Sequence, residues 1–344
     1  MKLLGLALAL ILVDAQVQAE EETTEIVTLT EAAALLTKTK VAEIENVIKE
    51  DLKMAPGYGL NCDPCYLGDL YGVIVRLVFH DAVGQQSRLN GCTDLNDPDN
   101  NGLNDIIVPL TAIWSKIGGA EIISFADFTA IAAKVAVEMS STISPQGDPE
   151  KPSEYDLVNS PLILPLKFGR LDQLSCNDEG SFPAPSFTWA ESAKLFNDKF
   201  GLNEVETVAL MGAHALGRAE IKNSGTSDQG WTEYQSSFAN RYFTDMYELN
   251  WRVSDDNNNV FKTNNEKLML LVSDTEMIIS PAANCVDWNS GPEEKEGACP
   301  LNVPILPVVK SFGGKGGLFL WWKHFEAAFT KMVEANNPGL YAAL

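Results

Sequence analysis

Histidine is scarce in this chain of 344 residues, which has only His80, His214 and His324. Positive charge is also scarce, because 25 Lys and Arg residues stand against 47 Asp and Glu residues, giving a net charge of -22. Such a surface repels nucleic acid and anionic membranes, so we expect neither as a partner. It would attract cationic donors or metal ions, but acidity that only keeps a protein in solution explains the charge as well.

Apolar runs long enough to span a membrane are missing too. The apolar run Leu3 to Val13 follows Met1 and Lys2 and is far shorter than the ~20 residues that a bilayer core requires. A basic start, a short apolar run and small residues near Ala19 are typical of a secretory signal. We therefore predict a signal peptide over residues 1–19, a secreted protein, and a mature domain over residues 20–344.

Cysteine is limited to six residues, and only one pair has C-x-x-C spacing, in Cys62-Asp63-Pro64-Cys65. Because no second such pair exists and no histidine is close in sequence, a zinc finger is disfavoured relative to structural disulfides. Six cysteines allow 15 connectivities, so the pairing stays open. We expect Cys285 and Cys299 to close the polar loop between them.

Strand-like alternation is scarce, whereas apolar residues recur at helical spacing in several windows. Long connections rich in Gly, Pro, Asn, Asp or Ser separate these windows. The pattern predicts a mainly α fold with two helical lobes, a first one over about 20–165 and a second one over about 166–344, able to hold a flat cofactor in a central crevice. The predicted helices are Ile26–Leu52, Leu67–Val83, Ile122–Met139, Trp189–Phe200, Glu204–Ala219 and Leu318–Ala335; the predicted connections are Gln85–Asn101, Ser144–Ser160, Ser254–Asn264 and Ser280–Pro300.

Arg76 and His80 are four residues apart in a predicted helix, so they share one face, with Phe79 beside them. A neutral imidazole can take a proton from a peroxide and return it to the leaving oxygen. A guanidinium can stabilise the negative charge that develops as the O–O bond breaks. The pair suits cleavage of hydrogen peroxide, although two polar residues on a solvated helix face would give the same spacing.

His214 lies among small residues in Gly212-Ala213-His214-Ala215-Leu216-Gly217-Arg218. Small neighbours would let a wide planar ligand approach the backbone, and imidazole is a common axial ligand of haem iron. A buried structural histidine is the alternative interpretation of this segment.

Together the Arg76 and His214 motifs resemble those of the plant, fungal and bacterial haem peroxidase superfamily, and the resemblance covers nearly the whole mature chain. Further segments match in the same order, which makes the resemblance specific. These segments are Asn100–Leu103, Ile123–Asp127, Phe168–Asp172, Phe182–Pro185, Phe238–Phe243 and Leu271–Asp274.

The resemblance implies a role for each matching residue. Arg76 and His80 correspond to the distal catalytic pair, and Asn100 to the amide that orients the distal imidazole. His214 corresponds to the proximal ligand of haem iron, and Asp274 to the carboxylate bonded to its other nitrogen, which makes the imidazole electron-rich. An ordinary helix N-cap is the alternative for Asp274.

Residues around the expected haem give mixed signals about the subclass. Phe79 is similar to the secreted fungal and plant members, in which Phe precedes the distal His. The proximal segment through Gly230-Trp231 resembles cytochrome c peroxidase and ascorbate peroxidase. Trp231 would then lie near the haem and Asp274, where its indole could hold a radical, but a tryptophan that only packs is an equal alternative.

Additional metal sites have weaker signals. Asp81 fits a distal calcium ligand of the secreted members, but Asn90 stands where a later acidic ligand is expected, so calcium is only a candidate cofactor. Ala215 and Ala239 replace the usual ligands of a proximal calcium. Asp69 and Glu220 make a poor manganese site. His324 falls on an amphipathic carboxy-terminal helix and is expected to be a surface or structural residue.

The resemblance implies a haem b enzyme that reduces hydrogen peroxide and oxidises a small donor, with phenols among the candidates, in one-electron steps through a ferryl intermediate. The alternative from another class is a catalytically inactive secreted matrix or defence protein that keeps the peroxidase fold.

Overall fold

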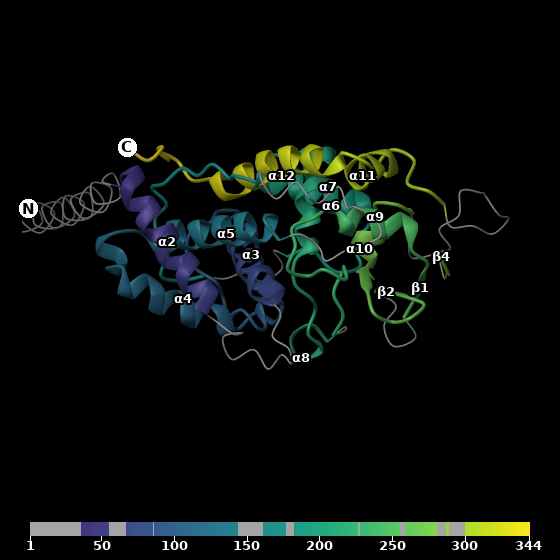
Figure 1. Ribbon diagram of the computed structural model, residues 1–344, viewed down its shortest axis with the longest axis horizontal. Helices are drawn as coiled ribbons and strands as arrows, with labels where there is room; N and C mark the ends of the chain where they lie inside the picture. Colours follow the sequence, from purple (N-terminus) through teal and green to yellow (C-terminus); the bar gives the residue numbers. More distant parts are fainter. Residues whose placement is uncertain are drawn as a thin grey trace, which may run out of the picture.

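The structure is a computed structural model, which describes residues 36–54, 67–84, 86–143, 161–176, 182–225, 228–254, 259–280, 287–288 and 300–344. Most of these residues that form regular structure are helical, which confirms the mainly α prediction (Figure 1). No described helix is long and apolar enough to cross a membrane. The predicted signal peptide, residues 1–19, lies outside the described residues.

Four helices in the first part of the chain pack on one another: α2 (Lys38–Met54), α3 (Leu67–Val83), α4 (Asn104–Lys116) and α5 (Phe125–Ser141). α5 lies at the centre of this group because nearly all of its apolar side chains are buried, and α2, α3 and α4 all contact it. The ends of α3 are as predicted. The predicted helix Ile26–Leu52 is described only from residue 36, and α2 begins at Lys38, whereas α4 was not predicted as a helix.

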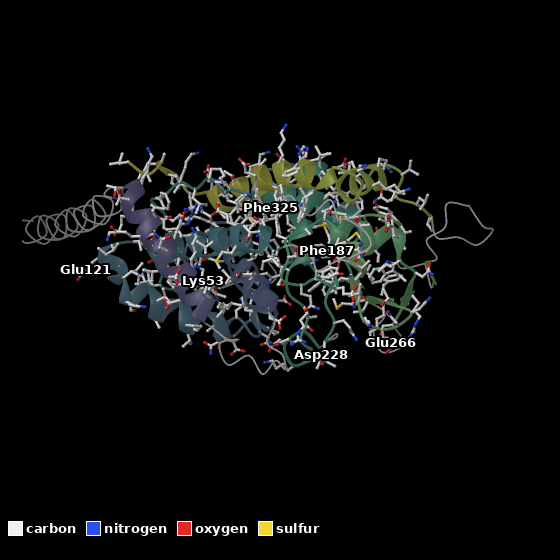
Figure 2. All side chains as sticks on the ribbon, viewed as in Figure 1. Lys53, Glu121, Phe187, Asp228, Glu266 and Phe325 are labelled. Carbon is white, nitrogen blue, oxygen red and sulfur yellow. A yellow bond between two sulfur atoms is a disulfide. The ribbon has the colours of Figure 1, made fainter. Side chains whose placement is uncertain are left out.

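The remaining helices form a second group in which α12 packs along α7 and α11 packs against α9. Figure 1 shows α12, in yellow, running along one edge of the molecule over α6 and α7. In Figure 2 the label of Phe325 marks this helix, and its ring packs against Phe238 with centroids 4.7 Å apart. The bounds are α6 (Trp189–Phe200), α7 (Glu204–Met211), α8 (Ile221–Ser224), α9 (Arg241–Glu248), α10 (Val272–Thr275), α11 (Leu306–Gly313) and α12 (Gly317–Glu334).

A pair of capping boxes fixes the tight connection between α6 and α7. Thr188 with Glu191 starts α6, and Asn203 with Glu206 starts α7; each pair satisfies backbone N–H groups that the first helical turn leaves free. Gly201 ends α6 with φ 67°, a left-handed conformation that favours glycine. α7 stops at Met211, so the single helix predicted over Glu204–Ala219 is wrong, and a 3-10 turn, η4 (Gly212–Ala215), carries His214 instead.

A small antiparallel sheet was missed by the sequence prediction. Its strand order is β3-β2-β1-β4, with β1 (Trp251–Val253), β2 (Val260–Thr263), β3 (Met269–Leu271) and β4 (Asp287–Trp288). β2 lies inside the predicted connection Ser254–Asn264. Strands of two to four residues are too short to give a clear alternating pattern, which explains the error.

One disulfide is described, between Cys92 and Cys176, with Cα atoms 5.7 Å apart. It joins the loop after α3 to the segment after Asp172, whose carboxylate accepts hydrogen bonds from the Phe125 and Ala126 N–H groups at the start of α5. The predicted closure of a loop by Cys285 and Cys299 lies outside the described residues, as do Cys62 and Cys65.

A buried ion pair ties the two helix groups together. Asp127 on α5 and Arg170 are both about 1% exposed, and Arg170 Nη1 donates to Asp127 Oδ1 over 2.7 Å. Arg170 Nε also donates to the Val333 carbonyl on α12, at 2.9 Å. Burial raises the pKa of Asp127 against the opposing effects of Arg170 and the Gly169 N–H. The pair therefore links α5, the segment around residue 170 and α12. The lobe boundary near 165/166 stays a prediction.

We predict that Arg170→Met lowers the free energy of unfolding by ~3–5 kcal/mol, because it leaves the Asp127 carboxylate buried without its cation. The matched control is Lys167→Met, three residues earlier, which breaks the half-exposed pair with Glu334 and should cost about 0–1 kcal/mol. Urea unfolding followed by circular dichroism measures both values. Equal losses in the two variants would contradict the role given to the buried pair.

Candidate active site

The distal side of the site is built on α3 and on the 3-10 turn η2 (Pro98–Asn100). His80 Nδ1 lies 2.8 Å from Asn100 Oδ1. Asn100 Nδ2 donates to the Asp94 carbonyl at 2.8 Å, so the amide oxygen must face the imidazole. An amide oxygen can only accept, so Nδ1 carries the proton and Nε2 is the nitrogen available as a base. Asn100 therefore lies where it can orient the imidazole, and its part in catalysis stays a prediction.

Arg76 lies one helical turn before His80, as expected from its spacing. Its guanidinium donates to the Asp99 carbonyl at 2.6 Å and to the Asn101 carbonyl at 2.9 Å, on either side of Asn100. Burial and the positive charge of Arg76 lower the pKa of His80 to about 3, although the Asn100 hydrogen bond opposes the shift. His80 is therefore neutral at physiological pH, as a general base must be.

Aromatic rings hold the His80 imidazole from two sides. Phe182 lies 4.6 Å away between ring centroids, and Phe79 meets it edge-on at 5.8 Å. Phe79 in turn packs on Phe196 of α6 at 5.9 Å. Phe182 belongs to a segment that resembles the family, but its contact with His80 was not predicted from the sequence.

The proximal side is organised by Asp274, whose side chain is fully buried in α10. Oδ1 accepts from His214 Nδ1 at 2.9 Å and from the Tyr242 hydroxyl at 2.5 Å. Oδ2 accepts from Trp231 Nε1 and from the Leu271 N–H, both at 2.8 Å. Burial alone raises the pKa of the Asp274 carboxyl, but His214 and the hydrogen bonds outweigh it and hold the pKa below its ordinary value. Asp274 is therefore an ionised acceptor.

Trp231 stacks on His214, with ring centroids 4.3 Å apart and planes at 21°. The preceding residue, Gly230, is held by bridges to Arg218 and Leu268, and its carbonyl accepts from the Met269 N–H at 3.0 Å. These bonds fix the tryptophan beside the histidine. The contact of Trp231 with Asp274 that the resemblance implied is present; whether the indole is oxidised stays a prediction.

Two glycines let the segment around His214 approach its neighbours. A Cβ on Gly212 would lie 2.5 Å from Trp321 Nε1, whose N–H donates to the Ala209 carbonyl of α7. A Cβ on Gly72 of α3 would lie 2.8 Å from the Gly217 Cα. Because real Cβ atoms do not approach so closely, these positions require glycine to bring the His214 turn against both α12 and α3.

Asp81 is bound to the backbone of the loop that follows α3. Its two carboxylate oxygens accept from the Asn90 N–H at 2.9 Å and the Gly91 N–H at 2.7 Å, so it fixes the loop after α3. Among the described residues no three His, Cys, Asp or Glu side chains gather into a metal-binding group. The candidate calcium at Asp81 is therefore not supported.

The other polar residues considered from the sequence have partners of their own. Asp69 pairs with Arg218 Nε at 3.2 Å, and Glu220 accepts from Asn223 at 2.7 Å. The ring of His324 on α12 lies against Phe312, with centroids 5.7 Å apart. Tyr242 is the residue that sequence reasoning missed: it lies within the matching segment Phe238–Phe243, but only the fold brings its hydroxyl to Asp274.

One histidine bound to an amide and a second bound to a buried carboxylate, each with Nε2 available, are typical of histidine-ligated haem enzymes. A family model described as "Peroxidase" matches residues 41–288. The chain belongs to this haem peroxidase family.

Several relatives are similar over part of the chain. A mitochondrial cytochrome c peroxidase of Yarrowia lipolytica is 29% identical over 51% of this chain, and the match covers 44% of that protein. A putative mitochondrial cytochrome c peroxidase of the same organism is 27% identical over 62% of this chain and 72% of its own length. Cytosolic L-ascorbate peroxidase 2 of Arabidopsis thaliana is 30% identical over 51% of this chain and 63% of its own.

The predicted secretion is wrong, because the matched relatives are named as mitochondrial or cytosolic peroxidases. That prediction rested on the short apolar run at residues 3–13, which lies outside both the described residues and the matched region. A run of this length is a weak signal by itself, and Phe79, which also suggested a secreted member, reports on packing around His80 and not on location.

We predict that the His80 imidazole stays neutral from about pH 8 down to about pH 4, since its pKa is lowered to about 3. In the unfolded chain it takes up a proton near the ordinary value of about 6.5. Between about pH 3 and about pH 6.5 the unfolded state thus binds more protons at His80 than the folded state. The contribution of His80 to the free energy of unfolding is therefore lost as the pH falls through this range. Imidazole NMR titration, compared with the His80→Gln variant, identifies the resonance; a midpoint near 6.5 would contradict the assignment.

Proposed function

We propose that this protein is a haem-dependent peroxidase that reduces hydrogen peroxide and oxidises a donor in one-electron steps. The observation that carries the proposal is the contrast between its two histidines. His80 is oriented by a neutral amide beside a guanidinium, whereas His214 is oriented by an ionised, buried carboxylate. The first arrangement suits a proton-transfer base and the second an electron-rich ligand.

The donor set fits haem b. His214 Nδ1 is engaged by Asp274, so Nε2 is the nitrogen that would ligate the iron. Ala213 and Ala215 on either side of His214 carry no bulk that would keep a planar macrocycle away. When bound, haem would supply the iron centre at which peroxide is cleaved and from which the donor is oxidised.

On the distal side, His80 and Arg76 would have different roles in breaking the O–O bond. His80 Nε2 accepts the proton of the bound peroxide oxygen and delivers it to the departing oxygen, so that water can leave. The Arg76 guanidinium stabilises negative charge on that oxygen. Asn100 keeps the proton of His80 on Nδ1 and thereby keeps Nε2 basic.

On the proximal side, Asp274 would hold the imidazole plane of His214 and draw on its Nδ1 proton. This makes Nε2 a stronger electron donor, which favours the oxidised states of the iron. Trp231 lies against His214 and shares Asp274, which supports the proposal that its indole gives up an electron during turnover. We therefore propose His214, Asp274, Trp231 and Phe79 as the haem environment, with Arg76, His80 and Asn100 as the catalytic set.

The donor is proposed only as a class, a reducing substrate. A phenol stays one candidate, beside the cytochrome c and ascorbate that name the relatives. The matrix or defence protein without activity is not favoured, because a chain with only a structural role has no use for a base, a cation and a carboxylate-bound histidine at such hydrogen-bond distances.

The test is a visible absorption spectrum of the haem-loaded protein before and after one equivalent of hydrogen peroxide. We expect a Soret band that shifts within milliseconds and recovers when a reducing donor is added. A protein that holds no haem, or holds haem that ignores peroxide, would contradict the proposed function.

We predict that His80→Leu slows the reaction with hydrogen peroxide by at least ~10²–10⁴, the usual contribution of a positioned general acid–base. His324→Leu is the matched control, because His324 lies on α12 against Phe312 and takes no part in the site. Stopped-flow measurement of the Soret change gives both rate constants. A His80→Leu rate within a few fold of the control would remove His80 from the mechanism.

A further inference from the structure

Tyr242 shares a carboxylate oxygen with His214. It lies near the start of α9, its side chain is fully buried, and its hydroxyl donates to Asp274 Oδ1 over 2.5 Å. His214 Nδ1 donates to the same oxygen over 2.9 Å. Trp231 and the Leu271 N–H use the other oxygen. The phenol therefore acts on the atom through which Asp274 reaches His214.

The position of the phenol is fixed by the fold. Its ring meets the imidazole of His214 edge-on at 5.9 Å and packs against Phe243 at 5.1 Å. α9 is in turn fastened to α11, because Asn240 Nδ2 donates to the Phe312 carbonyl at 2.7 Å. The Tyr242 hydroxyl thus has little freedom to leave Asp274.

Two donors on one carboxylate oxygen compete for its electron density. A hydrogen bond from a phenol to a carboxylate is charge-assisted and stronger than a neutral one. In a buried site the low local dielectric strengthens such a bond. It withdraws electron density from Asp274 Oδ1, which therefore attracts the Nδ1 proton of His214 less strongly. With the Tyr242 bond present, His214 keeps its proton more firmly and Nε2 is less electron-rich.

We propose that Tyr242 is a positioning residue that limits the electron donation of His214 by sharing Asp274 Oδ1. The inference rests on the proposed function, since it requires His214 Nε2 to ligate haem iron. Tyr242 acts through Asp274 and touches neither peroxide nor donor. Through His214 it adjusts the equilibrium between ferric and ferrous iron.

The test is Tyr242→Phe in the haem-loaded full chain, read by two quantities that a role in packing alone would not move. Removal of the hydroxyl should raise the iron–histidine stretching frequency of the ferrous protein in resonance Raman spectra. It should also shift the ferric/ferrous equilibrium toward ferric by about tenfold, which for one electron is ~59 mV in the reduction potential.

Tyr71→Phe is the matched control. It removes the hydroxyl of a different buried tyrosine, on α3, and should leave both quantities unchanged. If Tyr242→Phe does not hold haem, site-specific replacement of Tyr242 by 3-fluorotyrosine keeps the shape, strengthens the donor and should move both quantities the opposite way.

The possible outcomes distinguish a failure of the role proposed for Tyr242 from a failure of the proposed function. An iron–histidine band that is present in the unmodified protein but unchanged in the Tyr242 variants, or shifted with the opposite sign, overturns the role of Tyr242 alone. Absence of that band in the unmodified protein overturns His214 as the ligand, and the inference with it.

Discussion

The rest of the site depends on a single buried carboxylate. Asp274 is fully buried, and His214, Tyr242, Trp231 and the Leu271 N–H each donate to it. An ionised carboxylate without these donors would be costly inside the protein, so the site must assemble as a whole. Its donors come from η4, the segment between α8 and α9, α9 itself and the end of β3, so the fold brings four separate parts of the chain to one point.

The two histidines differ chiefly in the charge of the group on Nδ1. Asn100 is neutral and leaves His80 a neutral base, and the Arg76 charge further disfavours protonation. Asp274 is negative and makes His214 Nε2 a stronger electron-pair donor to a metal ion. The same side chain is thus given two chemical tasks by its hydrogen-bond partner. Gly72 and Gly212 allow the turn that carries His214 to pack closely against α3 and α12.

Much of this site could be predicted because its parts are local in sequence. Arg76 and His80 are one helical turn apart, and small residues surround His214. The pairing of His214 with Asp274 spans 60 residues and came only from family resemblance. Tyr242 and Phe182 reach the site by tertiary packing, for which no spacing exists. The short strands β1 to β3 lack a clear period. Pro109 disfavours a helix at α4, although Ile106, Leu110 and Ile113 are buried at helical spacing. Six cysteines could not reveal the Cys92–Cys176 pair.

The most direct test of the role of Asp274 is a redox titration of the haem-loaded protein and of its Asp274→Asn variant. Asparagine has nearly the same shape but no charge, so it keeps an acceptor for His214 while removing the electrostatic pull on its proton. We predict that the variant still ligates iron through His214 and that its ferric/ferrous reduction potential rises. An unchanged or lower potential in a variant that retains the histidine ligand would contradict it.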